Sequence, residues 1–422
     1  MNEKLTGQER SWVLYDVANS AFTMMVSTMI PLFFNALAAN ADISSVSYLA
    51  FWGYAASVST LIVAFSGPLI GTLSDFKGMK KKLFALSILL GGTGCMIMGF
   101  IRQWLLFLLI YIAARICYSL SLIIYDSMLP DITDDSRMDS ISSSGYAWGY
   151  IGSCIPFIIS LLLVLFSGKI GLSHLNALAL AFVITGLWWG AVSLPLIRSY
   201  QQKHYQEKER IQLHTTITGL AGSLRDISRN RHIYLFLLAF FFYIDGVYTI
   251  IEMATAYGSA LGLDSTGLLI ALLVTQFVAF PSCILIGRLA RHISSATLIS
   301  ICIIAYFCIA LYGATLHDQY QFWILAITVG LFQGGIQALS RSYFARIIPP
   351  EKSGEYFGIM DICGKGASFM GTMIVSLVSQ LTGNVNYGVG AISVTFIIGF
   401  ILFRMSVRTG HIQVIAPLKK TA

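Results

Sequence analysis

The sequence contains very little charge. Of its 422 residues, 11% are Asp, Glu, Lys or Arg, whereas 56% are hydrophobic. A soluble domain carries about 25% charged residues, which keep its surface hydrated. This shortage excludes an ordinary soluble protein and indicates that most of the chain lies in a lipid bilayer. The net charge of +7 comes from short basic clusters between apolar runs. Nucleic-acid binding requires a basic face with interleaved aromatic residues, so we expect no nucleic-acid partner.

Motifs of enzymes and metal sites are also missing. The seven cysteines are dispersed through apolar segments without a CxxC pair, which argues against a disulfide framework and a zinc site. The sequence has no GxxxxGK[ST] loop, no nucleophile–base set and no metal-ligand spacing. We therefore predict that the protein is not an enzyme, needs no cofactor and does not use ATP. The first apolar run lacks the short hydrophobic core and cleavage site of a signal peptide, so it should stay in the membrane.

The sequence is rich in long hydrophobic runs. A bilayer core about 30 Å thick requires roughly 20 apolar residues per helix. Twelve runs meet this requirement, over residues 11–38, 48–71, 83–101, 104–126, 142–166, 174–197, 232–257, 266–287, 295–316, 320–342, 355–379 and 386–404. We predict an all-α membrane protein whose parts are an N-terminal six-helix bundle (1–197), a cytoplasmic linker (198–231), a C-terminal six-helix bundle (232–404) and a cytoplasmic tail (405–422).

The basic residues predict how the chain is oriented. Placing both termini in the cytoplasm puts 23 of the 27 Lys and Arg residues at cytoplasmic ends, and leaves only Arg102 and Lys169 in outer loops. Cytoplasmic loops of membrane proteins are enriched in these residues, so we predict cytoplasmic termini. The strength of this bias and the compact loops favour a bacterial plasma membrane over a vacuolar membrane. We expect a monomer that is surrounded by the lipid bilayer.

The two halves of the chain resemble each other. Gly71 is followed by Pro130, and Gly287 is followed by Pro349 at nearly the same separation. Each glycine ends the second predicted helix of its half, and each proline ends the fourth. Two six-helix halves in parallel repeat are the architecture of rocker-type secondary transporters.

One predicted loop carries a motif. The segment GTLSDFKGMKKKL (71–83) holds two glycines suited to close approach and a tight turn, and an acid suited to a helix N-terminus. It resembles the loop between helices two and three of the major facilitator superfamily. The resemblance implies that the loop latches the two halves in one state, through Gly71, Asp75, Gly78 and Lys80. The alternative is a basic cytoplasmic loop with a turn. In the second half, GRLARHIS (287–294) has Arg291 where the acid would fall, so we expect a lopsided latch.

A more specific resemblance covers nearly the whole chain. Its five blocks are WVLYDVANSAF (12–22), YDSMLPDIT (125–133), SGYAWGYIG (144–152), YIDGVYTI (243–250) and VGLFQGGIQALSRSYFARIIPPEKSGEYFGIMDICGK (329–365). In this order they are similar to the autophagy-related vacuolar effluxers and their bacterial relatives, a family within the major facilitator superfamily. The resemblance implies efflux of small metabolites, and amino acids are favoured because the eukaryotic members release them from vacuoles.

Two carboxylates stand out inside the seventh run. Asp245, Thr249 and Glu252 are spaced i, i+4, i+7 and form one stripe on a helix. The helical rise places Asp245 about 20 Å deep, just past the midplane, and Glu252 about 30 Å along. A carboxylate at a helix centre costs on the order of 2.5–3.5 kcal/mol, so it should face a wet cavity or a partner. We predict a proton or ammonium site at Asp245, with Glu252 as the second candidate. The alternatives are a structural ion pair for Asp245 and an outer rim position for Glu252.

Groups of opposite sign lie at similar depth. Arg115 lies about 17 Å into the fourth helix and Lys365 about 14 Å into the eleventh. Asp361 stands one turn before Lys365, so these two residues could also neutralise each other. Gln333 and Gln337 share a face of the tenth helix. The resemblance implies that helices one, four, seven and ten line the cavity, so Arg115, Asp245 and Gln333 are expected to converge. Such a site suits a zwitterion, with a cation holding its carboxylate and Asp245 its ammonium.

Polar residues near the start of the first helix predict a gate. Asp16 and Asn19 belong to the first family block, and Asp16 lies only about 6–8 Å into its helix. We interpret it as a cytoplasmic-gate residue partnered with Arg341, at the inner end of the tenth helix. The prediction as a whole is a proton-coupled amino-acid exporter that works by alternating access. The rival hypotheses are a broad-specificity exporter of amphipathic compounds and a membrane sensor or scaffold that transports nothing.

Overall fold

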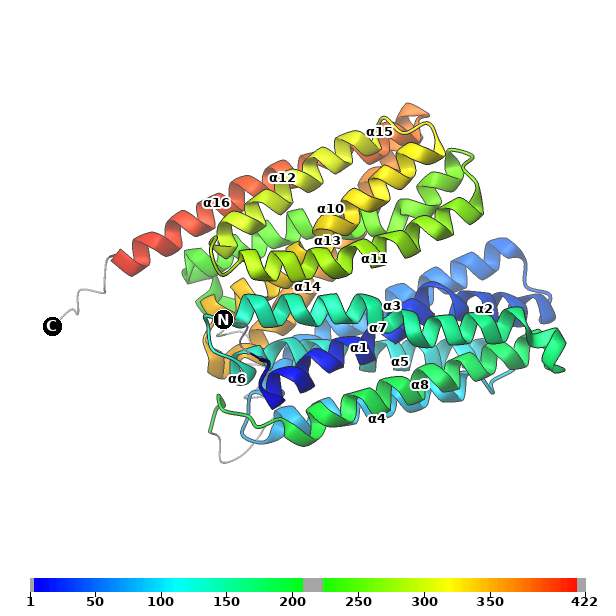
Figure 1. The fold of residues 1–422 in the computed structure, drawn as a ribbon, viewed down its shortest axis with the longest axis horizontal. Helices are drawn as coiled ribbons and strands as arrows, with labels where there is room; N and C mark the ends of the chain where they lie inside the picture. The colour runs from blue at the N-terminus through cyan, green and yellow to red at the C-terminus, as the bar shows by residue number, and fades with distance from the viewer. Residues whose placement is uncertain (1–3, 208–221, 223, 416–422) are drawn as a thin grey trace. The chain divides into compact units, whose positions relative to one another are not determined.

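The computed structural model describes residues 4–207, 222 and 224–415, and this part of the chain is almost entirely helical (Figure 1). Within it, twelve helices are long and apolar enough to cross a membrane, which is the number that the hydrophobic runs predict. Residues 208–221 and 223 of the predicted linker, and 416–422 of the predicted tail, lie outside the described residues. The chain divides into two compact units.

The first unit comprises Met1–Asp134, Trp148–Arg210 and Pro350–Gly358. Its helices are α1 (Gly7–Ser27), α2 (Met29–Asn40), α3 (Ser45–Ser74), α4 (Met79–Met98), α5 (Trp104–Ser127), α6 (Leu129–Ile132), α8 (His174–Ser199), α7 (Met138–Leu165) from Trp148 onward, and α14 (Ser353–Thr382) as far as Gly358. Short 3-10 turns cover Ser167–Ile170 and Pro350–Lys352.

The second unit comprises Asp135–Ala147, Ile211–Pro349 and Ile359–Ala422. Its helices are α10 (Arg231–Ala260), α11 (Ser265–Leu289), α12 (Ser295–Gly313), α13 (Gln319–Ile347), α15 (Val385–Ala391), α16 (Ser393–Ile415), the start of α7 and the remainder of α14. Helices α7 and α14, the fifth and eleventh spans, therefore each belong partly to one unit and partly to the other.

The same helix pairings occur in both units. In the first unit, the main packing partners are α1 with α8, α3 with α5, and α4 with both α5 and α8. In the second unit they are α10 with α16, α11 with α13, and α12 with both α13 and α16. Each pairing in the second unit is the first-unit pairing moved on by six membrane spans. The predicted repeat of two six-helix halves is thus present in the packing.

The predicted spans differ from the helices most clearly at the first and the twelfth, and the twelfth is divided into α15 and α16. The first span, predicted as one run, is broken at Thr28, which has φ −129° and ψ −73°. Pro31 lies just beyond, and because proline has no N–H, it cannot continue the hydrogen-bond ladder. At the other end of the chain, α16 continues to Ile415, past the predicted end at 404. Its last turns carry Arg404 and Arg408, which are good helix formers although they are not apolar.

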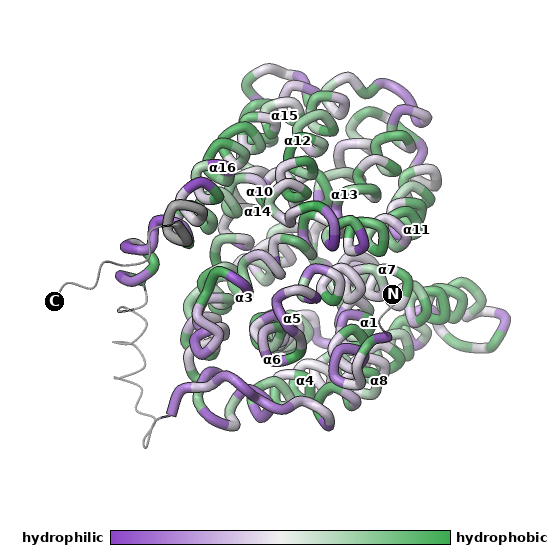
Figure 2. The backbone as a smooth tube through the Cα atoms, turned by 60° about the vertical axis from the view of Figure 1, so that its left-hand side comes forward, coloured by the Kyte–Doolittle hydropathy of each residue, from purple (hydrophilic) through white to green (hydrophobic). Residues whose placement is uncertain are grey.

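Hydrophobic residues follow the helices, and hydrophilic residues gather at their ends and in the connecting loops (Figure 2). Many large apolar side chains lie on the outside of their unit, including Phe65, Leu89 and Leu165. In water such a surface would aggregate, whereas in lipid it is the favourable one. Helix starts use short polar caps, as at Asp264 and Asp318, whose carboxylates accept the amides of Gly267 and Gln321.

Candidate functional site

The carboxylate of Asp245 is completely buried in α10. Its Oδ1 accepts the backbone amide of Gly371 in α14 at 2.7 Å, and both Asp245 and Thr249 have 0% exposure. Asp245 Oδ2 and Thr249 Oγ1 have no hydrogen-bond partner among the described residues. Glu252, the third residue of the predicted stripe, is exposed. Within the described part of the chain, the stripe therefore places two oxygen atoms without a hydrogen-bond partner in the interior of the second unit.

Gly371 allows this contact. A Cβ added at position 371 would overlap Thr249 Oγ1 and lie 2.5 Å from Asp245 Oδ1. The absence of a side chain is thus what lets the backbone of α14 reach the carboxylate. The role of Gly371 could not be predicted from the sequence, because one glycine in an apolar helix has no pattern that distinguishes it from a packing glycine.

Lys365 and Asp361 form an i, i+4 ion pair on α14. Their side chains are 26% and 22% exposed, so the pair is half-buried. This is the self-neutralising arrangement that the sequence analysis kept as an alternative. Arg115 on α5 is also half-buried. Its Nη1 donates to the neutral phenol oxygen of Tyr111 at 2.7 Å.

Gln333 lines a cavity of about 60 Å³ inside the second unit. The wall is mostly aliphatic, and its other polar members are Thr275 and Gln276 of α11. The α10 residues in the wall are Ile250, Ile251 and Ala254, which lie on the opposite side of that helix from the Asp245 stripe. Asp245 and the Gln333 cavity therefore lie on different faces of α10. Gln337, one turn after Gln333, is half-buried.

Asp16 and Asn19 lie within the first unit, on α1. Asp16 Oδ2 accepts the hydroxyl of Tyr125 at 2.8 Å, and Asn19 Nδ2 donates to Asp16 Oδ1 at 3.4 Å. Tyr125, near the end of α5, also stacks on Trp12 with ring centroids 4.4 Å apart. The acid of the first family block is therefore packed between α1 and α5, with hydrogen-bond donors on both of its oxygens.

The loop after α3 holds the start of α14 by a buried carboxylate. Asp75 Oδ1 and Oδ2 accept the amides of Gly354 and Glu355, at 2.8 Å and 3.0 Å. Gly71 contacts the same turn so closely that an added Cβ would overlap the Gly354 carbonyl oxygen. Gly78 has φ 72°, a left-handed conformation that glycine adopts without strain. Burial raises the pKa of Asp75 to about 6, against the opposing effect of Lys80.

Lys80 links Asp75 to a second buried acid. Its Nζ lies 3.4 Å from Asp75 Oδ1 and 4.0 Å from Asp131 Oδ2, and all three side chains are at most 1% exposed. Nζ also donates to the Ser127 carbonyl and to the Ser353 hydroxyl. We call Asp75, Lys80, Asp131 and the first turn of α14 the Asp75 cluster.

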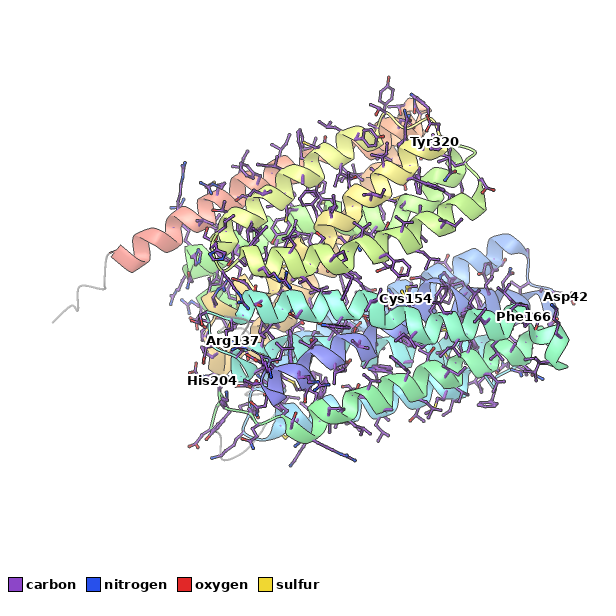
Figure 3. All side chains as sticks on the ribbon, viewed as in Figure 1. Asp42, Arg137, Cys154, Phe166, His204 and Tyr320 are labelled. Atoms are coloured by element: carbon purple, nitrogen blue, oxygen red, sulfur yellow. The ribbon has the colours of Figure 1, made fainter. Side chains whose placement is uncertain are left out.

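Residues 200–207, which follow α8, bind to this cluster from outside. Asp131 accepts the Tyr200 hydroxyl, the amides of Lys203 and His204, and a contact from His204 Nδ1 at 2.9 Å. His204 lies at the α6 end of the unit (Figure 3). Burial, and next the Asp131 carboxylate, raise the pKa of Tyr200 well above its ordinary value, so Tyr200 is a donor. Gln206 pairs with Phe76 in a short parallel bridge. The backbone amide of Gln206 donates to the backbone carbonyl of Asp75 at 2.8 Å.

A third buried acid holds the start of α7 in the second unit. Asp139 accepts both terminal nitrogens of Arg346, at 2.8 Å and 2.9 Å, and the hydroxyls of Ser295 and Ser342. We call these four residues the Asp139 cluster. Neither Asp139 nor Arg346 was predicted as a site residue, because a charge at a helix end is too common to indicate its partner.

The predicted gate and second-half latch residues also contact the start of α7. Arg341 donates to the Ser142 hydroxyl at 2.9 Å and to its carbonyl at 3.0 Å, and lies over the ring of Tyr146. Arg291 Nη2 donates to the Ser140 hydroxyl at 3.4 Å. Arg291 in the turn after α11 and Arg341 of α13 thus bind the first turns of α7.

Comparison with known proteins identifies relatives along almost the whole chain. Residues 7–413 match the family described as vacuole effluxer Atg22 like. The chain is 42% identical over 407 residues to an uncharacterized MFS-type transporter of Bacillus subtilis, YxiO, and the match covers 95% of each protein. It is 28% identical over 331 residues to autophagy-related protein 22 of Saccharomyces cerevisiae, covering 66% of this chain and 62% of the yeast protein.

The fold has close counterparts among solved structures. The fucose:proton symporter FucP of Escherichia coli, a member of the major facilitator superfamily, superposes with a TM-score of 0.72 at 15% identity. The match covers 95% of this chain and 97% of the symporter. Similarity at this level of identity shows a shared fold, and it confirms the predicted facilitator architecture.

Proposed function

Because the chain belongs to the Atg22-like vacuole effluxer family of MFS-type transporters, we propose that it exports an amino acid by alternating access, coupled to protons. The observation that carries the proposal is the buried carboxylate of Asp245, whose Oδ2 has no partner among the described residues. A charge inside a membrane protein is costly and needs a counter-charge or a proton. A proton or a substrate ammonium group supplies the partner that the described residues do not.

The cation that holds the substrate carboxylate is Arg115 in this proposal. Its partner in the described structure is a neutral phenol, so its positive charge is available to an anion, and a guanidinium can bind a carboxylate with two parallel hydrogen bonds. Lys365 is the second candidate, and it would first have to release Asp361. Gln333 and Gln337 of α13 are the neutral hydrogen-bonding groups of the proposal. Since the Gln333 cavity lies on the opposite face of α10 from Asp245, they would contact the substrate at another stage of transport.

The two clusters at the starts of α14 and α7 serve as latches in this proposal. Alternating access requires contacts that hold in one state and break in the other. The Asp75 cluster, with Gly71 and Gly78, holds the start of α14, whereas Asp16, Asn19 and Arg341 act as the gate. The basic residues at the helix ends support cytoplasmic termini. That bias and the bacterial relative support a location in a bacterial plasma membrane.

A rival function is supported by the cavity around Gln333. Its wall is mostly aliphatic, with Phe322 as its aromatic member, which suits an amphipathic compound as well as an amino acid. In that case Asp245 would serve structure, and transport would not depend on its charge.

Uptake and efflux in proteoliposomes test these alternatives. A panel of amino acids is offered with an imposed pH gradient, to the native protein, to Asp245→Asn and to Glu252→Gln, which removes an exposed carboxylate from the same helix. We expect gradient-driven movement of one amino acid, lost in Asp245→Asn by about tenfold or more and retained in Glu252→Gln. Exchange of the same amino acid should survive in both variants. Transport of amphipathic dyes but of no amino acid would favour the rival, and no transport of either would favour a sensor or scaffold.

A further inference from the structure

The contact between α10 and α14 at Gly371 has features beyond those of ordinary helix packing. The amide of Gly371 donates to Asp245 Oδ1 at 2.7 Å. Several glycines that pack closely elsewhere do so against apolar side chains, as Gly152 does against Val17. At Gly371 the nearest atoms are instead the hydroxyl of Thr249 and the carboxylate of Asp245. Two polar side chains with 0% exposure therefore converge on one backbone position.

The hydrogen bond distinguishes the two carboxylate oxygens. Oδ1 is held by an N–H, which is a donor in every protonation state, so a proton is added preferentially at Oδ2. Thr249 stands one turn further along the same face of α10, and its hydroxyl has no partner among the described residues. A hydroxyl can donate to Oδ2 when the carboxylate is charged and accept from it when the acid is protonated. Thr249 thus suits both states of the site.

Along α10 and α14, the charged side chains of the described residues that flank this site in sequence are either exposed or already paired. The next charged side chain on α10 is Glu252, which is exposed, and those preceding Gly371 on α14 are Asp361 and Lys365, which neutralise each other. From α16, the group that packs against the neighbouring Gly246 is the ring of Phe396. Among the described residues Asp245 has a hydrogen bond from the Gly371 amide and no ion pair, so its orientation depends on that amide.

From these contacts we infer that Gly371 and Thr249 are positioning residues for the coupling step. Gly371 holds Oδ1 and ties α14 to α10. Thr249 and Oδ2 are not hydrogen-bonded to each other in this structure, and in this inference the Thr249 hydroxyl becomes the partner of Oδ2 during the coupling step. The inference rests on the proposed role of Asp245 in coupling. It predicts that a side chain at 371 separates coupling from substrate binding, because a Cβ there would displace the Asp245 and Thr249 side chains while leaving Arg115 and Gln333 unchanged.

Transport assays with Gly371→Ala test the inference. The matched control is Gly364→Ala on the same helix, where an added Cβ would meet Phe240 and Tyr248 at an ordinary 3.6–3.7 Å. We expect Gly371→Ala to lose gradient-driven accumulation by about tenfold or more while exchange stays within about twofold of native. Thr249→Ser should accumulate substrate as the native protein does. Accumulation by Thr249→Val should fall between that of the native protein and that of Gly371→Ala. Equal loss of accumulation and exchange in Gly371→Ala, or full retention of both, would overturn the inference.

Infrared difference spectroscopy gives a readout that does not depend on any substrate. The protonated carboxyl band that Asp245→Asn removes is assigned to Asp245 and followed as the pH is changed. The band should shift in frequency and titrate at a different pH in Gly371→Ala, and stay unchanged in Gly364→Ala. An identical band in both variants would contradict the positioning role even if the native protein moved no amino acid. Conversely, shifted bands in a protein that ignores pH gradients would leave the positioning intact and refute the proposed coupling.

Discussion

The Asp75 cluster and the Asp139 cluster perform the same structural task with opposite arrangements. In the first unit the acid belongs to the loop after α3, and the incoming helix α14 supplies backbone amides. In the second unit the acid belongs to the incoming helix α7, and the resident helices supply Arg346 and two hydroxyls. The two halves share the same helix pairings. They differ in the segment that carries the acid, which is the loop after α3 in the first unit and helix α7 in the second.

The difference has an electrostatic consequence. Backbone amides at a helix N-terminus carry a partial positive charge, and their N–H groups point along the helix axis. The Asp75 carboxylate therefore binds them only when the first turn of α14 is aligned with it. A guanidinium on a long side chain can follow a carboxylate as it moves. We therefore expect the Asp75 cluster to be the more sensitive of the two to small changes.

The largest effect is expected from Lys80→Met. The substitution leaves two fully buried acids, Asp75 and Asp131, without their shared cation. Breaking a buried ion pair by removing one partner costs about 3–5 kcal/mol. We expect a large fall in the thermal midpoint measured in detergent. The control is Lys82→Met, since this nearby lysine of α4 is exposed; an equal fall in both variants would rule out a special role for Lys80.

Arg346→Ala should have a smaller effect on stability. Its side chain is 21% exposed, and the hydroxyls of Ser295 and Ser342 remain to bind Asp139. We expect a loss of about 2–3 kcal/mol, read as a lower denaturation midpoint in the same detergent. Arg346→Lys should recover only part of it, because lysine cannot bind both carboxylate oxygens in parallel. A loss larger than that of Lys80→Met would reverse the ranking of the two clusters.

The smallest effect concerns pH. The pKa of Asp75 is raised from 3.8 to about 6 in the folded protein, so between these values the folded state keeps a proton that the unfolded chain has released. Stability from this group is therefore highest below about pH 4, falls as the pH rises to about 6, and is constant above that range. The thermal midpoint of the native protein, measured relative to Asp75→Asn, should follow this course. Asp42→Asn, at an exposed loop acid, is the control, and a difference curve that rises between pH 4 and 6 would contradict the assignment.

The features that could be predicted from the sequence are those that depend on local spacing. Hydrophobic runs long enough to cross a bilayer predict the twelve spans, and the positions of Gly71 and Gly78 predict the tight loop around Asp75. The Asp245 stripe follows from i, i+4 spacing in one helix. In each case the pattern and its consequence lie within a few turns of each other.

The contacts that the sequence did not predict join distant segments. Gly371 lies far from Asp245 along the chain, and Arg346 lies far from Asp139, yet each pair is joined by a hydrogen bond. Asp131 was part of a quoted family block, yet its partners Lys80 and His204 come from other parts of the chain. No periodicity encodes such pairings, because they arise only when helices pack. The predicted partnership of Asp16 with Arg341 is of the same kind and remains a prediction.

The segment 200–207 also has a consequence for how the protein is made. A ribosome delivers residues 75, 80, 131 and 204 long before it delivers residue 353, so the newly made first half must hold a buried lysine without the α14 turn beside it. Asp131 provides a second carboxylate next to Lys80, and the segment that follows α8 closes over Asp131 with donors from the same half. The first six helices thus leave the translocon with the charge of Lys80 already opposed, and the amides of Gly354 and Glu355 later complete the binding of Asp75.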